Sequence, residues 1–165
     1  MWPQISRHPT RRGAYQLKTE QWLPRPRSEV FAFFADAFNL ESITPPWLNF
    51  HVVTPRPIAM SAGTLIEYRL RLHGIPLWWR TEISRWEPPF SFVDQQLRGP
   101  YRLWHHLHTF AERDDGTLCT DVVDYAFFGG PLVHSLLVKR DLEAIFHFRS
   151  ERLEQLLGAA SAATT

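Results

Sequence analysis

The stretch Gly99–Phe110, GPYRLWHHLHTF, decides the fold, because a turn signal leads into a long candidate β-strand that carries three histidines. Side chains of a strand point alternately to its two faces. One face would hold Trp104, His106, His108 and Phe110, and the other Leu103, His105, Leu107 and Thr109. Which face is buried determines whether the histidines take part in chemistry.

Turn signals divide the chain around this stretch into a series of candidate strands. The candidates are Phe50–Val53, Thr64–His73, Leu77–Trp86, Ser91–Arg98, Tyr101–Glu112 and Thr117–Phe127. The separators are short and rich in Gly, Pro and Asp, as in Gly99-Pro100 and Asp114-Asp115-Gly116, which is typical of hairpin turns. Connections this short make neighbouring strands antiparallel.

The segment before these strands predicts one more strand and two short helices. Ala14–Leu23 alternates in the manner of a first strand. Ser28 stands where an N-cap residue is expected, ahead of an apolar helix that runs to Phe38. Asn39–Ile43 would form a second helical turn, which the prolines that follow would end.

The C-terminal part predicts one long helix, Leu132–Leu157, because the apolar period changes to that of an α-helix. Its apolar stripe consists of Val138, Leu142, Ile145, Phe146, Leu153 and Leu156. Arg149 falls near the middle of this stripe. An arginine there must reach a carboxylate or a wet cavity, because an unpaired buried charge is very unfavourable.

Composition favours one ordinary globular domain: 165 residues, of which 44% are hydrophobic and 21% charged. The formal net charge of +1 argues against nucleic-acid binding. The single cysteine, Cys119, excludes an internal disulfide and favours a reducing compartment, so we expect a cytoplasmic protein. Charges interrupt every apolar run before the roughly 20 residues that a membrane-spanning helix needs.

We expect three parts along the chain: a flexible basic arm over residues 1–13, a single domain over 14–157 and a flexible tail over 158–165. The domain would be α+β, with a curved seven-stranded antiparallel sheet, two short helices after the first strand and a long C-terminal helix. Such an arrangement leaves a hollow between the sheet and the long helix.

The order of elements resembles that of the SRPBCC superfamily, which has the START / Bet v 1-like helix-grip fold. The motifs that carry the resemblance are ITPPWL (Ile43–Leu48), GTLIEYRLRLHGIPLWWRTEI (Gly63–Ile83), GPYRLWHHLHTF and the run from Asp121 to Tyr125. The chain is most similar to small bacterial members described as cyclases or ligand-binding proteins. The resemblance extends over about Gln16–Leu157 and implies a cavity under the C-terminal helix.

The resemblance also implies that the face with His106 and His108 points inward. The polar side chains of the predicted cavity are Asp94, Gln96, His106, His108, Asp121, Tyr125 and Arg149. Its apolar wall would consist of Trp79, Phe92, Trp104, Phe110, Val138, Leu142 and Phe146. This mixed surface predicts binding of a small, mostly apolar or amphipathic molecule, lipid-, polyketide- or aromatic-like, with a polar or anionic end.

Other interpretations of the polar residues stay open. His106 and His108 with Asp121 could bind a metal ion, but paired buried side chains are the commoner arrangement, and we predict no metal or cofactor. His106, His108, Asp121 and Tyr125 are also candidates for proton transfer in a cyclase, dehydratase or hydrolase. Asp121 could instead neutralise Arg149.

A further alternative concerns the outer face of the sheet. Trp78 and Trp86 share one phase of their strand, opposite to that of Trp79. If both are exposed, they could form a patch that binds a protein partner.

Overall fold

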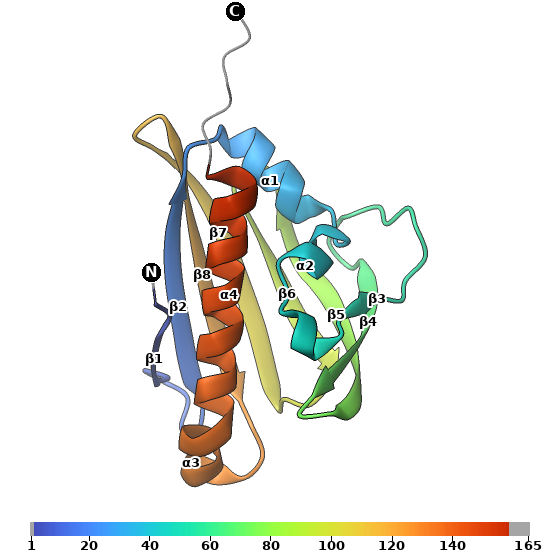
Figure 1. Ribbon diagram of the computed structural model, residues 1–165, viewed down its shortest axis with the longest axis vertical. Helices are drawn as coiled ribbons and strands as arrows, with labels where there is room; N and C mark the ends of the chain where they lie inside the picture. The colour runs from blue at the N-terminus through green and yellow to red at the C-terminus, as the bar shows by residue number, and fades with distance from the viewer. Residues whose placement is uncertain (1, 159–165) are drawn as a thin grey trace, which may run out of the picture.

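The computed structural model describes residues 2–158, within which eight strands form one sheet in the order β1-β2-β8-β7-β6-β5-β4-β3 (Figure 1). The strands are β1 Gln4–Arg7, β2 Tyr15–Leu23, β3 His51–Val52, β4 Leu65–Leu72, β5 Ile75–Glu87, β6 Ser91–Arg98, β7 Leu103–Arg113 and β8 Gly116–Ala126. Every neighbouring pair is antiparallel. The α+β helix-grip prediction is confirmed, with one strand more than the seven expected.

The additional strand comes from the N-terminal segment. Gln4–Arg7 pairs with β2, and Ile5 lies opposite Leu17 and packs against the apolar cluster around it. The prediction of a flexible arm over residues 1–13 is therefore wrong for β1, whose four residues are too few to show a periodic pattern. The predicted tail lies outside the described residues, apart from Gly158.

The short helices α1 Arg27–Ala35, α2 Asn39–Ser42 and η1 Pro46–Leu48 follow β2. Ser28 does not cap α1, because the helix already begins at Arg27. The carbonyl group of Pro26 accepts hydrogen bonds from the backbone N–H groups of Glu29 and Val30. The helices lie on the same side of the sheet as the C-terminal helix (Figure 1).

The predicted C-terminal helix consists of α3 Gly130–Val133, a π-helical turn η2 over His134–Val138, and α4 Lys139–Leu157. Val138, Leu142, Phe146 and Leu153 are buried, as the stripe predicts. The predicted stripe is wrong in its last member, because Leu156 is exposed and Leu157 is buried in its place.

An irregularity in β5 separates the two tryptophans that were expected on its outer face. The register with β6 shifts between Ile83 and Arg85. Trp78 is exposed, but Trp86 packs against Phe31. A bulge of this kind reverses the alternation beyond it. The prediction of an exposed Trp78/Trp86 patch is therefore wrong for Trp86.

Two clusters of buried apolar side chains join the helices to the sheet. One contains Val30 and Phe31 of α1 together with Leu153 and Leu157 of α4. The other is centred on Tyr125 of β8. Among residues 2–158, no helix combines the length and the apolar character needed to cross a membrane.

Candidate functional site

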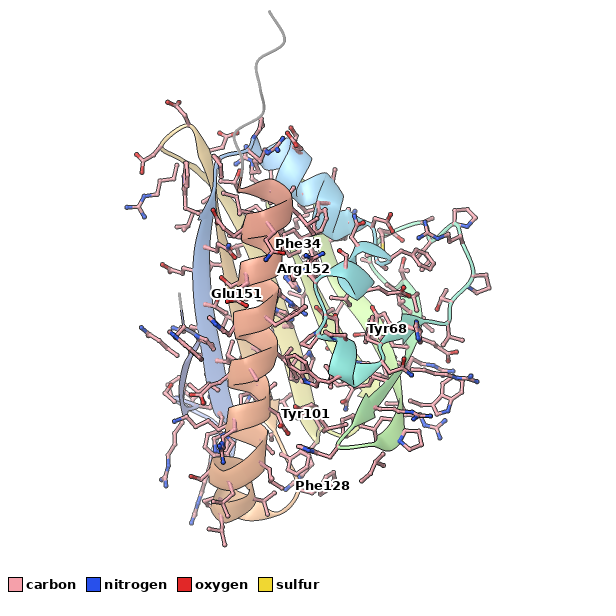
Figure 2. The ribbon with its side chains drawn as sticks, in the orientation of Figure 1. Phe34, Tyr68, Tyr101, Phe128, Glu151 and Arg152 are labelled. Atoms are coloured by element: carbon pink, nitrogen blue, oxygen red, sulfur yellow. The ribbon has the colours of Figure 1, made fainter. Side chains whose placement is uncertain are left out.

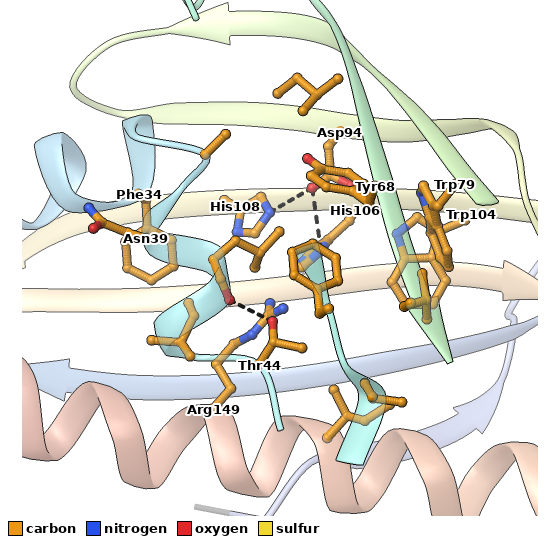
Figure 3. Close-up of a pocket in the computed structure, with 18 of the residues that line it drawn as sticks. Phe34, Asn39, Thr44, Tyr68, Trp79, Asp94, Trp104, His106, His108 and Arg149 are labelled. Atoms are coloured by element: carbon orange, nitrogen blue, oxygen red, sulfur yellow. Dashed lines mark hydrogen bonds and ion pairs between the residues drawn. The ribbon is translucent and has the colours of Figure 1, made fainter. Parts of the chain in front are cut away.

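A cavity of about 170 Å³ lies between the sheet and the helices (Figure 3). Most of its wall is apolar and comes from α1, the segment from α2 to Phe50, strands β4 to β7, and α4. The predicted site residues that line it are Trp79, Phe92, Asp94, Trp104, His106, His108, Leu142, Phe146 and Arg149. The sequence thus predicted much of the wall, while the binding role of these residues stays a prediction.

The remaining predicted site residues do not reach the cavity surface. Gln96 binds the backbone of Tyr101 through both ends of its amide. Phe110 and Val138 are part of the apolar core. Asp121 lies behind the histidines, and the Tyr125 hydroxyl group contacts His134.

The strand register brings two histidines and two carboxylates together. Asp94 on β6 lies opposite His106 on β7, and His108 lies opposite Asp121 on β8. The phase that the resemblance implied is confirmed, since His106, His108 and Asp121 are buried. We call Asp94, His106, His108 and Asp121 the polar quartet.

Each imidazole of the polar quartet lies between both carboxylates. His106 Nε2 is 2.8 Å from Asp121 Oδ1, and its Nδ1 is 3.5 Å from Asp94 Oδ2. His108 Nε2 is 2.8 Å from Asp94 Oδ2, and its Nδ1 is 2.8 Å from Asp121 Oδ1. The last contact is close but lacks the alignment of a hydrogen bond. The two rings lie 3.7 Å apart.

The pKa values of the two histidines shift in opposite directions. Burial and the neighbouring His108 lower the pKa of His106, which outweighs the effect of the carboxylates. Burial also opposes the charged form of His108, but the close carboxylates of Asp121 and Asp94 raise its pKa overall. Burial would raise the pKa values of Asp94 and Asp121, yet the histidines lower both, that of Asp121 strongly. His108 is therefore the more basic of the two imidazoles.

Arg149 reaches from α4 toward the same space as Asp94, His106 and His108 (Figure 3). It does not pair with Asp121, which rules out that alternative. Across residues 2–158, Arg149 has no salt bridge, and its buried Nε has no hydrogen-bond partner. Its guanidinium carbon lies 4.9 Å from the ring centre of Phe146. Arg149 thus borders a largely apolar cavity without a salt-bridge partner among the described residues, although its charge helps to lower the pKa of Asp94.

Sequence reasoning missed several cavity residues, among them Phe34 of α1, Tyr68 of β4 and Tyr101 (Figure 2). Burial, reinforced by the charge of Asp94, raises the pKa of Tyr68, so its hydroxyl group stays neutral. The alternation of Ile66, Tyr68 and Leu70 was a signal that could have identified it. Phe34 had no comparable signal, because α1 is apolar on several sides.

The atoms at this wall allow two kinds of chemistry. Imidazoles beside carboxylates can donate or accept protons. The same nitrogen and oxygen atoms are also donors that divalent transition-metal ions prefer.

Comparison with known proteins identifies a family. The profile of the family described as "Polyketide cyclase / dehydrase and lipid transport" matches residues 23–152. No match to this chain is found among curated proteins.

Solved structures share the architecture at low sequence identity. Protein CV1439 from Chromobacterium violaceum has a TM-score of 0.70 and 13% identity, covering 87% of this chain and 97% of that chain. Protein Ms6760 from Mycobacterium smegmatis has a TM-score of 0.65 and 17% identity, covering 93% and 95%. Major latex-like protein 151 from Panax ginseng has a TM-score of 0.65 and 11% identity, covering 87% and 97%. At such identities the likeness concerns the fold.

Proposed function

This chain belongs to the polyketide cyclase / dehydrase and lipid transport family of the SRPBCC superfamily, and we propose that its cavity binds a small, mostly apolar molecule with an anionic end. Ligand binding is the coarse function that the family supports. The chemistry of the ligand is inferred from the wall of the cavity.

Arg149 is the observation that carries the proposal. Its guanidinium has a planar set of donors that matches a carboxylate or phosphate. Leaving a buried donor unsatisfied costs about 1–3 kcal/mol, and Arg149 Nε is such a donor. An anionic group at this place would supply the missing acceptor and a countercharge in direct contact.

The rest of the wall fits the apolar part of the ligand. Trp79 and Trp104 meet edge to face beside Tyr101, and Leu142 and Phe146 line the α4 side. Burying apolar area contributes roughly 25 cal/mol per Å². The aromatic wall therefore supplies affinity, and Arg149 supplies orientation.

The test compares ligands that differ only in their polar end. We would measure binding of decanoate and decanol, and of 1-naphthoate and 1-naphthol, by isothermal titration calorimetry. The wild-type protein is expected to bind at least one carboxylate ten-fold or more tightly than the matched alcohol. Arg149→Met should remove this preference, whereas Arg140→Met, at an exposed position of the same helix, should retain it. Equal binding of acid and alcohol, or no binding of either pair, would overturn the proposal.

A further inference from the structure

Three donor atoms of the polar quartet have the spacing of metal ligands. Asp94 Oδ2 lies 2.8 Å from His108 Nε2 and 3.5 Å from His106 Nδ1. Asp94, His106 and His108 each offer one ligand atom, and these atoms lie within 4.8 Å of one another. Ligands at about 2.0–2.2 Å from a zinc ion are roughly 3 Å apart at a right angle and roughly 3.4 Å apart in a tetrahedron. The observed separations suit a single ion.

Asp121 lies where a supporting residue of such a site belongs. Its Oδ1 contacts His106 Nε2 and His108 Nδ1, the ring nitrogens that face away from Asp94. Metal-binding histidines commonly direct their other nitrogen at a carboxylate, which sets the tautomer and the ring orientation. Asp121 thus leaves His106 Nδ1 and His108 Nε2 available on the side of Asp94.

The three proposed ligand residues also line the cavity. Asp94, His106 and His108 all line the cavity, and Arg149 points into it from α4 (Figure 3). Three protein ligands with a free position are typical of metal sites that bind a substrate or a water molecule. A fourth ligand could therefore come from the cavity.

We propose that Asp94, His106 and His108 bind one divalent transition-metal ion of the Zn²⁺ class, with Asp121 as the positioning residue behind both imidazoles. The sequence suggested Asp121 as the third ligand. The structure instead assigns that place to Asp94, because Asp121 contacts the opposite nitrogens. The ion would take the place of the hydrogen bond between His108 Nε2 and Asp94 Oδ2.

The metal-site proposal is independent of the anionic-ligand proposal, because Arg149 is not one of the three metal ligands. The two are compatible, because a metal ion and Arg149 would face one negatively charged group from two sides. A metal ion would also make the polar quartet more positive.

The experiment uses the full chain, stripped with a chelator and dialysed, with Zn²⁺ alone as the probe. Competition with a chromophoric chelator should give one Zn²⁺ per chain, and Co²⁺ should give visible bands of a nitrogen- and oxygen-ligated ion. Loss of a supporting residue typically lowers metal affinity about 10- to 100-fold. Asp121→Asn should lower the Zn²⁺ affinity within this range. Asp94→Asn and His108→Gln should lower the Zn²⁺ affinity by more than this. His105→Gln is the control, because His105 lies on the opposite phase of β7.

Either of two results would overturn the metal-site proposal. One is wild-type protein that binds no Zn²⁺ in the competition assay. The other is Asp94→Asn protein, folded by circular dichroism, with wild-type affinity. Arg149→Met should still bind one Zn²⁺ per chain, with equal or higher affinity, because it removes a positive charge that acts on Asp94. Failure of the metal site and failure of the anionic-ligand proposal therefore give different results.

Discussion

The hydroxyl group of Tyr125 lies 2.8 Å from Nε2 of His134, and this contact joins strand β8 to the π-helical turn η2. Both residues are buried, and the His134 ring stacks on Tyr15 with 3.4 Å between ring centres. Burial raises the pKa of Tyr125. Tyr125 therefore holds the start of the C-terminal helix against the sheet.

Tyr125→Phe is expected to destabilise the protein by about 1–2 kcal/mol, because it removes a buried hydrogen bond and leaves His134 without that partner. Urea unfolding followed by circular dichroism measures the change. Binding of decanoate and of Zn²⁺ should stay within two-fold of wild type. A large loss of binding without loss of stability would contradict this structural role.

Arg149→Leu should raise the free energy of unfolding by up to about 1 kcal/mol, because it removes an unsatisfied donor from the cavity wall. The small cation–π contribution from Phe146 is lost as well, which limits the gain. Urea unfolding of the ligand-free protein tests this, with Arg140→Leu as the control. A loss of more than 1 kcal/mol would show that Arg149 serves structure.

Trp78 and Trp86, which the sequence placed on one face of β5, should differ in their effect on stability. Trp86→Ala is expected to cost about 2–3 kcal/mol, since Trp86 packs against Phe31 and Phe92. Trp78→Ala should cost less than about 1 kcal/mol, because Trp78 is exposed. Thermal unfolding of both variants makes the comparison, and equal losses would argue against the bulge.

Asp121→Asn should destabilise the metal-free protein by about 3–5 kcal/mol near pH 6, because it breaks a buried ion pair. The carboxylate, whose folded-state pKa is lowered, stabilises the fold above its unfolded-state pKa of about 3.9. This contribution is lost as the pH falls through the lower folded-state value. The stability gap between wild type and variant should therefore narrow below about pH 4.

Urea unfolding at a series of pH values, with a chelator present, tests the Asp121 prediction. Asp124→Asn is a suitable control, because Asp124 lies on the same strand but outside the polar quartet. A gap that stays constant down to pH 2.5 would contradict the assignment of the lowered pKa.

Cys119 should resist alkylation in the folded protein. Burial, together with the charge of Asp121, raises the pKa of its thiol to about 12. Because the thiolate is the reactive form, iodoacetamide at pH 8 should modify the native chain far more slowly than the urea-unfolded chain. Mass spectrometry measures the extent of labelling, and rapid native labelling would show that the site opens.

Local patterns were sufficient for most of the fold. Hairpin signals such as Asp114-Asp115-Gly116 identify the antiparallel neighbours because the turn chemistry is local. The bulge before Trp86 and the π turn at His134–Val138 depend on packing between distant segments. Each of them changes the phase of an element by one residue. Periodicity in the sequence cannot reveal such a change.

The sequence likewise predicts one part of the candidate site and not the other. The alternation of β7 brings His106 and His108 to one face, and the resemblance identifies that face as the inner one. The choice between Asp94 and Asp121 as the closer partner of each ring nitrogen depends on side-chain rotamers. The strand pattern contains no information about these.

The polar quartet also has a consequence for how the chain finds its fold. Asp94, the two histidines and Asp121 come from three adjacent strands, so their pairing specifies the alignment of β6, β7 and β8. A slip of β7 by one residue would turn both imidazoles outward and bury two carboxylates without partners. A substitution at one of these four positions would therefore affect both the alignment of the strands and the proposed binding site.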